Sequence, residues 1–424
     1  MVLIWKRIGF PITITDYKDK DFVLYGKDLY YFVIKNLIDM DDIETVKKLK
    51  KNLKPEIILD FDKNPYGEMK IKINYSERLS QKRLSLEKNK DNNNIIFIYM
   101  DNLSRLHFYR QYKKTKKFLK KFFNYEGFRV NNEQNYHAFE FLKYHKFKGA
   151  TLTNAIPMFN GVYFEENNKI ISILKNFKEN GYVTCNVQDI CHKELMRIGP
   201  LKGYRYIEFD HEYSSPNCDP NIYNLGYGIF SGENGILRRC LYGKENFYYN
   251  IVYAKQFWRA YKKNKKFLRI VNSYAHEYSG EKSKYSDEIL YKFFKELYFN
   301  GEMENTNVFI VGDHGYVGLY GLYKILKSKD WEIESSLPVF VMITFDKKNL
   351  SYYEQYNEIK KNQQNFITPF DIYFTLSHIL YGNEYDKIYS LNKKKYGESL
   401  FRYINSYERN CKKYKYLTSE CQCK

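Results

Sequence analysis

The sequence predicts an α/β protein with a mainly parallel central sheet and helices on both faces. Short strands that are apolar on both faces alternate along the chain with amphipathic helices, which is the pattern of a parallel sheet covered on both sides. The 424 residues are 44% hydrophobic and 18% aromatic. This composition excludes a disordered chain, and the length excludes a small disulfide scaffold.

The alternation starts at Ile95. The apolar strand Ile95–Met100 precedes a helix expected over Ser104–Phe123. Three further helix and strand pairs follow, with helices expected over Lys169–Asn180, Phe247–Lys263 and Ser286–Phe299, each leading into an apolar strand. Leu337–Phe345 has the length of a strand, not of a membrane span.

Composition along the chain predicts three parts. Residues 1–79 are short apolar segments cut by charge, which we interpret as a small β-containing layer, and Ser80–Asn94 is polar enough for a surface linker. The predicted division is 1–93 for the amino-terminal region and linker, 94–390 for the catalytic-type domain and 391–424 for a basic, cysteine-bearing tail.

The formal charge of the chain is +19, from 69 Lys and Arg against 50 Asp and Glu. The lysine run between Lys113 and Lys121 is most simply a solvated helix face, and no RNA-binding signature appears, so we expect no nucleic-acid partner. The charge instead suits an anionic substrate. The five apolar residues before Lys6 are too few for a signal peptide or a membrane span, although an upstream anchor stays open.

The seven cysteines show no zinc-site spacing. Cys218 with Cys240 and Cys411 with Cys421 are separated by plausible loops and are able to pair in an oxidising compartment. Buried free thiols are an equally good interpretation.

The candidate chemistry lies where strands end, because ligands bind at the carboxyl edge of such sheets. Asp101 follows one apolar strand, and Asp313 with His314 follows another, which together predict a divalent metal site. Each alone is also typical of a turn. Thr151 or Thr153 begins a short helix whose free N–H groups favour an anion. The alternative is that both threonines only cap the helix, a role that suits Thr153 better than Thr151.

The ordered motifs resemble the alkaline phosphatase and sulfatase superfamily, and within it the uncharacterised eukaryotic sulfatase-like branch. The resemblance extends over roughly Asn94 to Ser390, and the motifs that carry it are Met100-Asp101-Asn102-Leu103-Ser104-Arg105, Thr151-Leu152-Thr153-Asn154, Phe159-Asn160-Gly161, His276 and Gly312-Asp313-His314-Gly315. It implies a three-layer α/β/α sandwich.

The resemblance also implies roles for individual residues. Asp101, Asp313 and His314 match the metal ligands, Thr151 matches the nucleophile and His276 matches a histidine that contacts substrate or a second metal. Asn154 is a candidate to hold a non-bridging oxygen. Candidate substrate-binding residues are Thr153, Glu334 and Arg105.

Two departures from the pattern shape the expected mechanism. Sulfatases of this layout need Cys or Ser where this chain has Thr151, which favours phosphorus chemistry like that of the phosphodiesterase and phosphoethanolamine-transferase branches. The Asp-x-x-x-His pair of two-metal members is missing around His276, so we expect one metal site, with the second absent or built differently. The metal is Zn, Ca, Mn or Mg.

The expected function is a metal-dependent hydrolase or transferase that acts on a phosphoester or phosphodiester of a lipid head group or glycan through a Thr nucleophile. The alternatives are a catalytically inactive surface or binding protein and, third, a sulfuric ester hydrolase. The resemblance implies a secreted, extracellular or membrane-associated protein, with membrane association through the substrate or an anchor.

Overall fold

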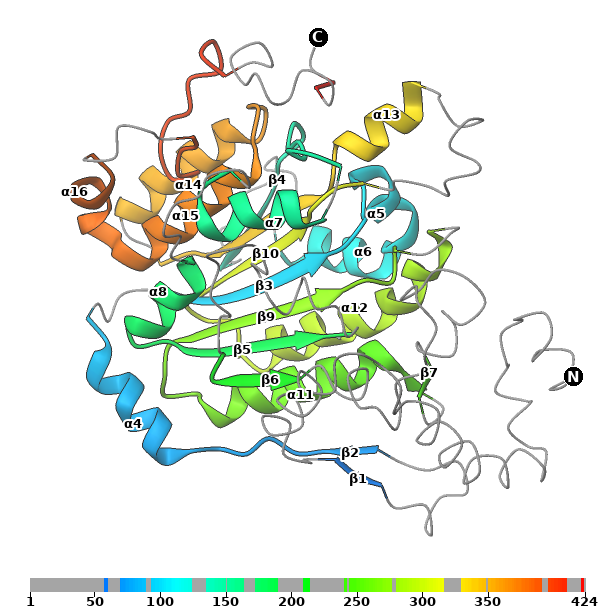
Figure 1. The fold of residues 1–424 in the computed structure, drawn as a ribbon, viewed down its shortest axis with the longest axis vertical. Helices are drawn as coiled ribbons and strands as arrows, with labels where there is room; N and C mark the ends of the chain where they lie inside the picture. The colour runs from blue at the N-terminus through cyan, green and yellow to red at the C-terminus, as the bar shows by residue number, and fades with distance from the viewer. Residues whose placement is uncertain are drawn as a thin grey trace, which may run out of the picture.

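The computed structural model shows a 7-stranded mixed sheet flanked by helices (Figure 1). The described residues are 57–59, 69–88, 93–123, 135–149, 151–163, 172–189, 209–213, 240–241, 244–276, 280–315, 329–347, 350–390, 396–409 and 421–422. The sheet has the strand order β4-β11-β10-β3-β9-β5-β6. Its members are β3 (Asn94–Met100), β4 (Tyr136–Glu140), β5 (Val183–Gln188), β6 (His211–Tyr213), β9 (Lys266–Asn272), β10 (Thr306–Gly312) and β11 (Phe340–Phe345).

The five strands from β10 to β6 pair in parallel, whereas β11 pairs antiparallel with both β10 and β4. The prediction of a mainly parallel sheet is therefore confirmed. The central strands β3, β9 and β10 are buried almost along their whole length, as their continuous apolar runs predict. Two small antiparallel pairs lie apart from the sheet, β1 (Ile57–Leu59) with β2 (Met69–Ile71) and β7 (Cys240–Leu241) with β8 (Lys244–Glu245).

Helices cover both faces of the sheet, as the three-layer prediction requires (Figure 1). On one face α7 (Thr151–Asn160) places the Phe159 ring 5.1 Å from the Phe97 ring of β3. On the other face α11 (Asn246–Ala260) covers β5 and β6, where Phe257 contacts His211. The remaining long helices are α12 (Lys284–Phe299), beside α11, and α14 (Leu350–Asn362) and α15 (Pro369–Tyr381), of which α15 packs on α7.

The helix expected over Ser104–Phe123 is wrong as a single element, because the chain forms α5 (Arg105–Gln111) and α6 (Lys113–Phe122). The break at Tyr112 lets the Asp287 carboxylate of α12 accept the free N–H groups of Lys114 and Thr115 at 2.8 and 2.9 Å. Lys113, Lys114, Lys117, Lys120 and Lys121 are exposed, which confirms the solvated lysine face. The expected helix over Lys169–Asn180 is observed as α8 (Ile173–Glu179), capped by Ser172, and its first three residues lie outside the described part.

The surface linker predicted over Ser80–Asn94 is wrong for its first half, where α4 (Glu77–Leu86) begins three residues earlier. The Ser76 hydroxyl caps this helix, and the Arg83 side chain is buried in an ion pair with Asp210. Polarity alone suggested solvent exposure, whereas Arg83 and Ser80 are buried by partners distant in sequence. The three-part division of the chain stays a prediction.

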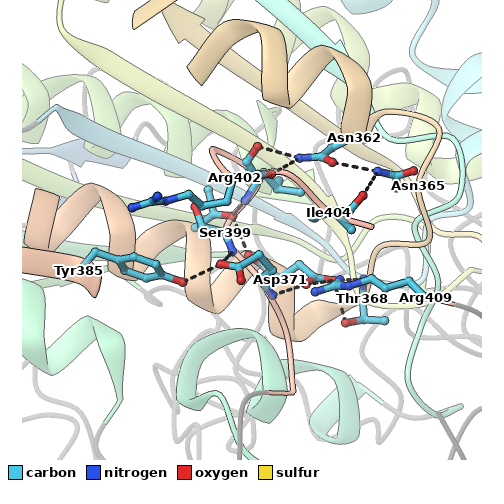
Figure 2. Close-up of polar contacts among 12 residues, drawn as sticks. Asn362, Asn365, Thr368, Asp371, Tyr385, Ser399, Arg402, Ile404 and Arg409 are labelled. Atoms are coloured by element: carbon cyan, nitrogen blue, oxygen red, sulfur yellow. Dashed lines mark hydrogen bonds and ion pairs between the residues drawn. The ribbon is translucent and has the colours of Figure 1, made fainter. Parts of the chain in front are cut away.

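Residues 396–409 of the predicted tail lie against α14 and α15 (Figure 2). The buried Asp371 carboxylate accepts bonds from the Glu398 N–H at 2.7 Å and from Arg409 at 2.5 Å, and Asn362 donates to the carbonyls of Leu400 and Arg402. Cys421 is disulfide-bonded, and Cys185 is a buried free thiol. Cys218 and Cys411 lie outside the described residues.

None of the described helices combines the length and apolar character needed to cross a lipid bilayer.

Candidate active site

Asp101, Asp313 and His314 converge at the carboxyl edge of the sheet. They follow β3 and β10, which are parallel neighbours with Met100 in register with Gly312. One ligand atom from each of the three residues lies within 4.8 Å of the others, and all three side chains are buried. Neighbouring parallel strands thus place two acidic groups and one imidazole at one point, as the motif order predicts.

Thr151 lies beside this cluster at the first residue of α7. Its Oγ1 is 3.3 Å from Asp101 Oδ1 and 3.3 Å from His314 Nε2. The amino terminus of a helix carries a partial positive charge, which favours an anion beside Thr151.

The buried donor set fits a divalent metal ion. Asp313 Oδ1 accepts the N–H groups of Asn102 and His314 at 3.0 and 2.8 Å, whereas Oδ2 is buried without a hydrogen-bond partner and lies 3.4 Å from His314 Nε2. His314 Nδ1 lies 2.9 Å from the Gly315 carbonyl oxygen, so the proton belongs on Nδ1 and the Nε2 lone pair is free for a ligand. Carboxylate oxygens and a neutral imidazole nitrogen are the donors that Zn²⁺ and similar ions bind.

Asn102 is a further residue of the site. It belongs to the motif that begins at Met100, and the sequence predicted no role for it. It has φ 61°, a left-handed conformation that is uncommon outside glycine and best tolerated by Asn and Asp. This turn aims its N–H at Asp313, while its Nδ2 donates to the Ala275 carbonyl at 3.0 Å. Asn102 thus joins the ends of β3, β9 and β10. Its position directly after a strand-terminal aspartate was the available signal.

The side chain of Asn154 is bonded to the turn that precedes Thr151. Its Oδ1 accepts the N–H groups of Phe147 and Lys148 at 2.6 and 3.2 Å, and its Nδ2 donates to the Lys148 carbonyl at 2.6 Å. Asn154 is fully buried. These contacts fix the path of the chain into α7 and so the position of Thr151. Thr153 is half-buried, two residues after Thr151.

His276 follows β9 and is half-buried, outside the cluster of three ligand candidates. Its backbone N–H donates to the Ser273 carbonyl at 2.8 Å, which closes a turn at the same sheet edge. The neighbouring Ala275 carbonyl is the acceptor for Asn102, so this turn is bonded to the chain segment that follows β3.

Glu334 lies in α13 (Lys329–Ser336) and bonds to the β3–α5 connection. Its carboxylate accepts the Ser104 hydroxyl at 2.9 Å and two Arg110 nitrogens at 2.8 and 2.7 Å. Burial alone would raise the pKa of Glu334, but the bonds from Arg110 and Ser104 outweigh it and hold the pKa below its usual range. Arg105 is half-buried one residue after Ser104, and its Nε has no hydrogen-bond partner.

Backbone contacts place the Glu334 segment directly against the ligand strand. A Cβ added to Gly315 would lie 1.8 Å from the Glu334 carbonyl oxygen, and the Gly315 N–H donates to the Ser335 carbonyl at 3.0 Å. Only glycine permits this approach. The role that the structure gives Glu334 is therefore to join α13 to the strand ends that carry Asp101 and His314.

Asp189 follows β5 and is buried near Asp101. Burial raises its pKa to about 8, against the hydrogen bond from Ser273, and the negative charge of Asp101 adds to the shift. The Ser273 N–H donates to Asp189 Oδ2 at 2.8 Å. Polar groups therefore continue along the sheet edge beyond β9, away from the cluster.

The sheet, the ordered motifs and the buried cluster define a member of the alkaline phosphatase and sulfatase superfamily. Within it, the family described as "Protein of unknown function (DUF229)" matches residues 59–424, so the chain belongs to that family. The predicted superfamily is confirmed. A search of curated proteins finds no match to this sequence.

Three solved structures that are similar to this chain come from bacteria. The chain is 12% identical to the C-terminal periplasmic domain of EcEptC from Escherichia coli in complex with Zn, covering 76% of this chain and 93% of that one at a TM-score of 0.47. The lipoteichoic acid synthase LtaP from Listeria monocytogenes is 12% identical, covering 77% and 82% at 0.45. The PsFucS1 sulfatase from Pseudoalteromonas sp. is 13% identical, covering 74% and 73% at 0.42.

Proposed function

We propose that this protein is a metal-dependent hydrolase or transferase of phosphoesters, with Thr151 as its nucleophile. The observation that carries the proposal is the pair of 3.3 Å distances from Thr151 Oγ1 to Asp101 Oδ1 and to His314 Nε2. A hydroxyl held between a carboxylate and an imidazole at a helix amino terminus is placed to attack an anionic ester.

The divalent ion would be held by Asp101, Asp313 and His314. When bound, such an ion lowers the pKa of a coordinated hydroxyl and neutralises charge on phosphoryl oxygens. Zn²⁺ and Mn²⁺ suit the mixed oxygen and nitrogen donors better than Ca²⁺ and Mg²⁺, which prefer oxygen alone.

Residues of the chain carry out the nucleophilic attack, the proton transfers and the stabilisation of charge. Thr151 Oγ forms a bond to phosphorus while the bond to the leaving oxygen breaks, and its proton passes to Asp101 Oδ1, the acceptor of its hydrogen bond. The partial positive charge at the amino terminus of α7 offsets the negative charge on the phosphoryl oxygens. His276 lies at the same edge and is the candidate to donate a proton to the departing oxygen. Water or an acceptor alcohol then attacks the phosphorus and gives a proton to His276, while the bond to Thr151 Oγ breaks and Asp101 returns the proton to Thr151.

We assign Asn154 and Glu334 to positioning, not to contact with the ester. Every side-chain atom of Asn154 that is able to form hydrogen bonds contacts the backbone of Phe147 or Lys148, and Glu334 is bonded to Ser104 and Arg110. Thr153 and Arg105 remain candidates for substrate binding. The unpartnered Arg105 Nε is suited to an anionic oxygen.

Phosphate is favoured over sulfate by the nucleophile itself. The sulfatases that this layout resembles need Cys or Ser, and Thr151 occupies that position here. An unmodified threonine hydroxyl is able to attack phosphorus. The +19 net charge suits an anionic phosphate-bearing substrate, and the disulfide-bonded Cys421 suits an oxidising, secretory or extracellular compartment.

Steady-state hydrolysis of aryl phosphodiesters and aryl sulfates tests the proposal. Thr151→Ala and Asp313→Ala should each lose activity by about a thousandfold or more, as removal of a nucleophile or metal ligand does in other enzymes. The matched control is Asp386→Ala, which removes an exposed carboxylate on α16 (Tyr385–Ser390). Parent activity retained by Thr151→Ala contradicts the mechanism, and a preference for the sulfate contradicts the substrate class. No turnover of any ester by metal-supplemented protein favours the inactive binding protein.

A further inference from the structure

A second set of buried polar groups lies beside the candidate active site, beyond β9. The Gln188 side chain at the end of β5 is fully buried, and neither its Nε2 nor its Oε1 has a hydrogen-bond partner. The Ser273 hydroxyl just after β9 is likewise fully buried, beside the Asp189 carboxyl. An unpaired buried amide is costly, so Gln188 requires an explanation.

Strand register places Gln188 on the same face of the sheet as the nucleophile. Gln188 is in register with Val271, and Val271 with Tyr99, so these side chains share one face. The Tyr99 ring lies 6.3 Å from the Phe159 ring of α7, the helix that starts at Thr151. Gln188 therefore points into the layer between the sheet and α7.

A continuous line of contacts joins this region to Asp101. The Asp101 N–H donates to the Asn272 carbonyl at 2.9 Å, and the next residue, Ser273, donates its N–H to Asp189 Oδ2 at 2.8 Å. Adjacent strands lie about 4.8 Å apart, so Ser273 lies about 5 Å and Gln188 about 10 Å from β3. Thr151 Oγ1 lies 3.3 Å from Asp101, the residue that follows β3, so Ser273 and Gln188 lie along the same sheet edge as the nucleophile.

The chemistry of these groups selects the kind of ligand. Gln188 offers two donors and an acceptor, and Ser273 offers one of each, without positive charge. Arg269, a cation on this face, lies deeper, where its guanidinium carbon is 5.6 Å from the Phe159 ring centre and its Nε donates to Asn186. Hydroxyl groups are the partners that such neutral donors and acceptors fit.

We infer that Gln188 and Ser273 form a subsite that binds an uncharged polyol group of the ester next to the phosphoryl group at Thr151. The inference rests on the proposed function and deepens it, because it names the part of the substrate that these side chains recognise. The Gln188 amide gains its hydrogen bonds when the polyol binds, and Ser273 offers its hydroxyl beside it.

Three p-nitrophenyl phosphodiesters test the subsite, since they release the same phenol and differ only in the second ester group. Their second groups are 2,3-dihydroxypropyl, propyl and 3-aminopropyl. The parent protein should have kcat/KM about tenfold higher for the dihydroxypropyl ester than for the propyl ester, the size expected for one to two hydrogen bonds. Gln188→Leu and Ser273→Ala should each reduce that preference and leave the rate on the propyl ester unchanged within about twofold. A glucos-6-yl diester then distinguishes a sugar from a short polyol.

Thermal unfolding separates ligand binding from a structural role. Gln188→Leu removes an unpartnered amide and should raise the melting temperature of the free protein. The matched control is Asn250→Leu on α11, where both side-chain amide atoms are also buried and unpartnered but lie on the opposite sheet face. It should raise the melting temperature without changing the preference between esters.

Several outcomes overturn the subsite. The subsite is rejected if the parent protein hydrolyses the dihydroxypropyl and propyl esters at equal rates, or if it prefers the aminopropyl ester. It is also rejected if the Gln188→Leu protein is less stable than the parent and keeps the parent's preference for the dihydroxypropyl ester. If the parent hydrolyses no diester, the proposed function fails, and calorimetric titration decides the subsite separately. Thr151→Ala protein should bind methyl 2,3-dihydroxypropyl phosphate more tightly than methyl propyl phosphate, and equal binding rejects the subsite.

Discussion

The backbone N–H of Asn102 donates to Asp313 Oδ1 at 3.0 Å, across the ends of two neighbouring parallel strands. This bond requires the left-handed backbone of Asn102, which follows one ligand candidate directly and orients another. The geometry of the cluster thus depends on a residue that is not itself in it.

Substitution of Asn102 separates its backbone role from its side-chain role. Asn102→Gly retains the left-handed conformation and loses the side-chain bond to Ala275, so affinity for Zn²⁺ should stay within about threefold. Asn102→Val places a β-branched residue at positive φ, at a cost of about 1–3 kcal/mol, and should weaken Zn²⁺ binding by about tenfold or more. Calorimetric titration measures both. Equal affinity in the Val and Gly proteins would show that this backbone conformation does not matter.

Gly315→Ala should disrupt the site because the new Cβ would overlap the Glu334 carbonyl oxygen. We expect a loss of about 2–4 kcal/mol in the free energy of unfolding, typical of an enforced backbone shift, together with loss of activity. Gly149→Ala is the matched control, since no atom lies within 4 Å of its added Cβ. Denaturant unfolding of both proteins measures the difference. Similar stabilities for the two variants would contradict the close approach.

Asn154→Ala distinguishes positioning from contact with the phosphoryl group. Loss of the bonds to Phe147 and Lys148 should lower the free energy of unfolding by about 2–4 kcal/mol and activity by at least about tenfold. Thermal unfolding and steady-state kinetics measure the two effects. A variant with reduced kcat and unchanged stability would instead support the direct role in holding a non-bridging oxygen.

The Arg83–Asp210 ion pair should make stability depend on pH in the acidic range. Burial would raise the pKa of Asp210, but Arg83 and Lys178 outweigh it and lower the pKa. A carboxyl with a lowered folded-state pKa stabilises above its unfolded value of about 4, and this contribution is lost as the pH falls through the folded-state pKa. Arg83→Met should therefore be less stable than the parent at pH 7, and the gap should narrow toward pH 3. Urea unfolding across this range measures it, and a gap constant with pH would contradict the assignment.

The sequence predicted the sheet and the cluster well because both depend on local pattern. Apolar runs mark the buried strands, and Asp101, Asp313 and His314 are strand-terminal residues whose positions follow once the strands are neighbours. Thr151 at the start of α7 follows from the turn before it.

Features set by partners distant in sequence were not predictable in the same way. The sequence of helix α4 has the polarity of a linker, and its ion pair between Arg83 and Asp210 forms only in the folded chain. The break at Tyr112 likewise depends on contacts with Asp287 of α12. The hydrogen bonds that Asp371 accepts from the Glu398 N–H and from Arg409 likewise form only in the folded chain (Figure 2). Pairing of this kind leaves no periodic signal.

The metal content of purified protein tests the central claim most directly. After dialysis against Zn²⁺ or Mn²⁺ and removal of free ions, elemental analysis should find about one ion per chain in the parent and in Asp386→Ala, the exposed carboxylate control. Asp313→Ala should retain less than about a tenth of an ion per chain, because a buried carboxylate ligand is lost. A parent protein without bound metal, or an Asp313→Ala protein that binds as much as the parent, would contradict the account.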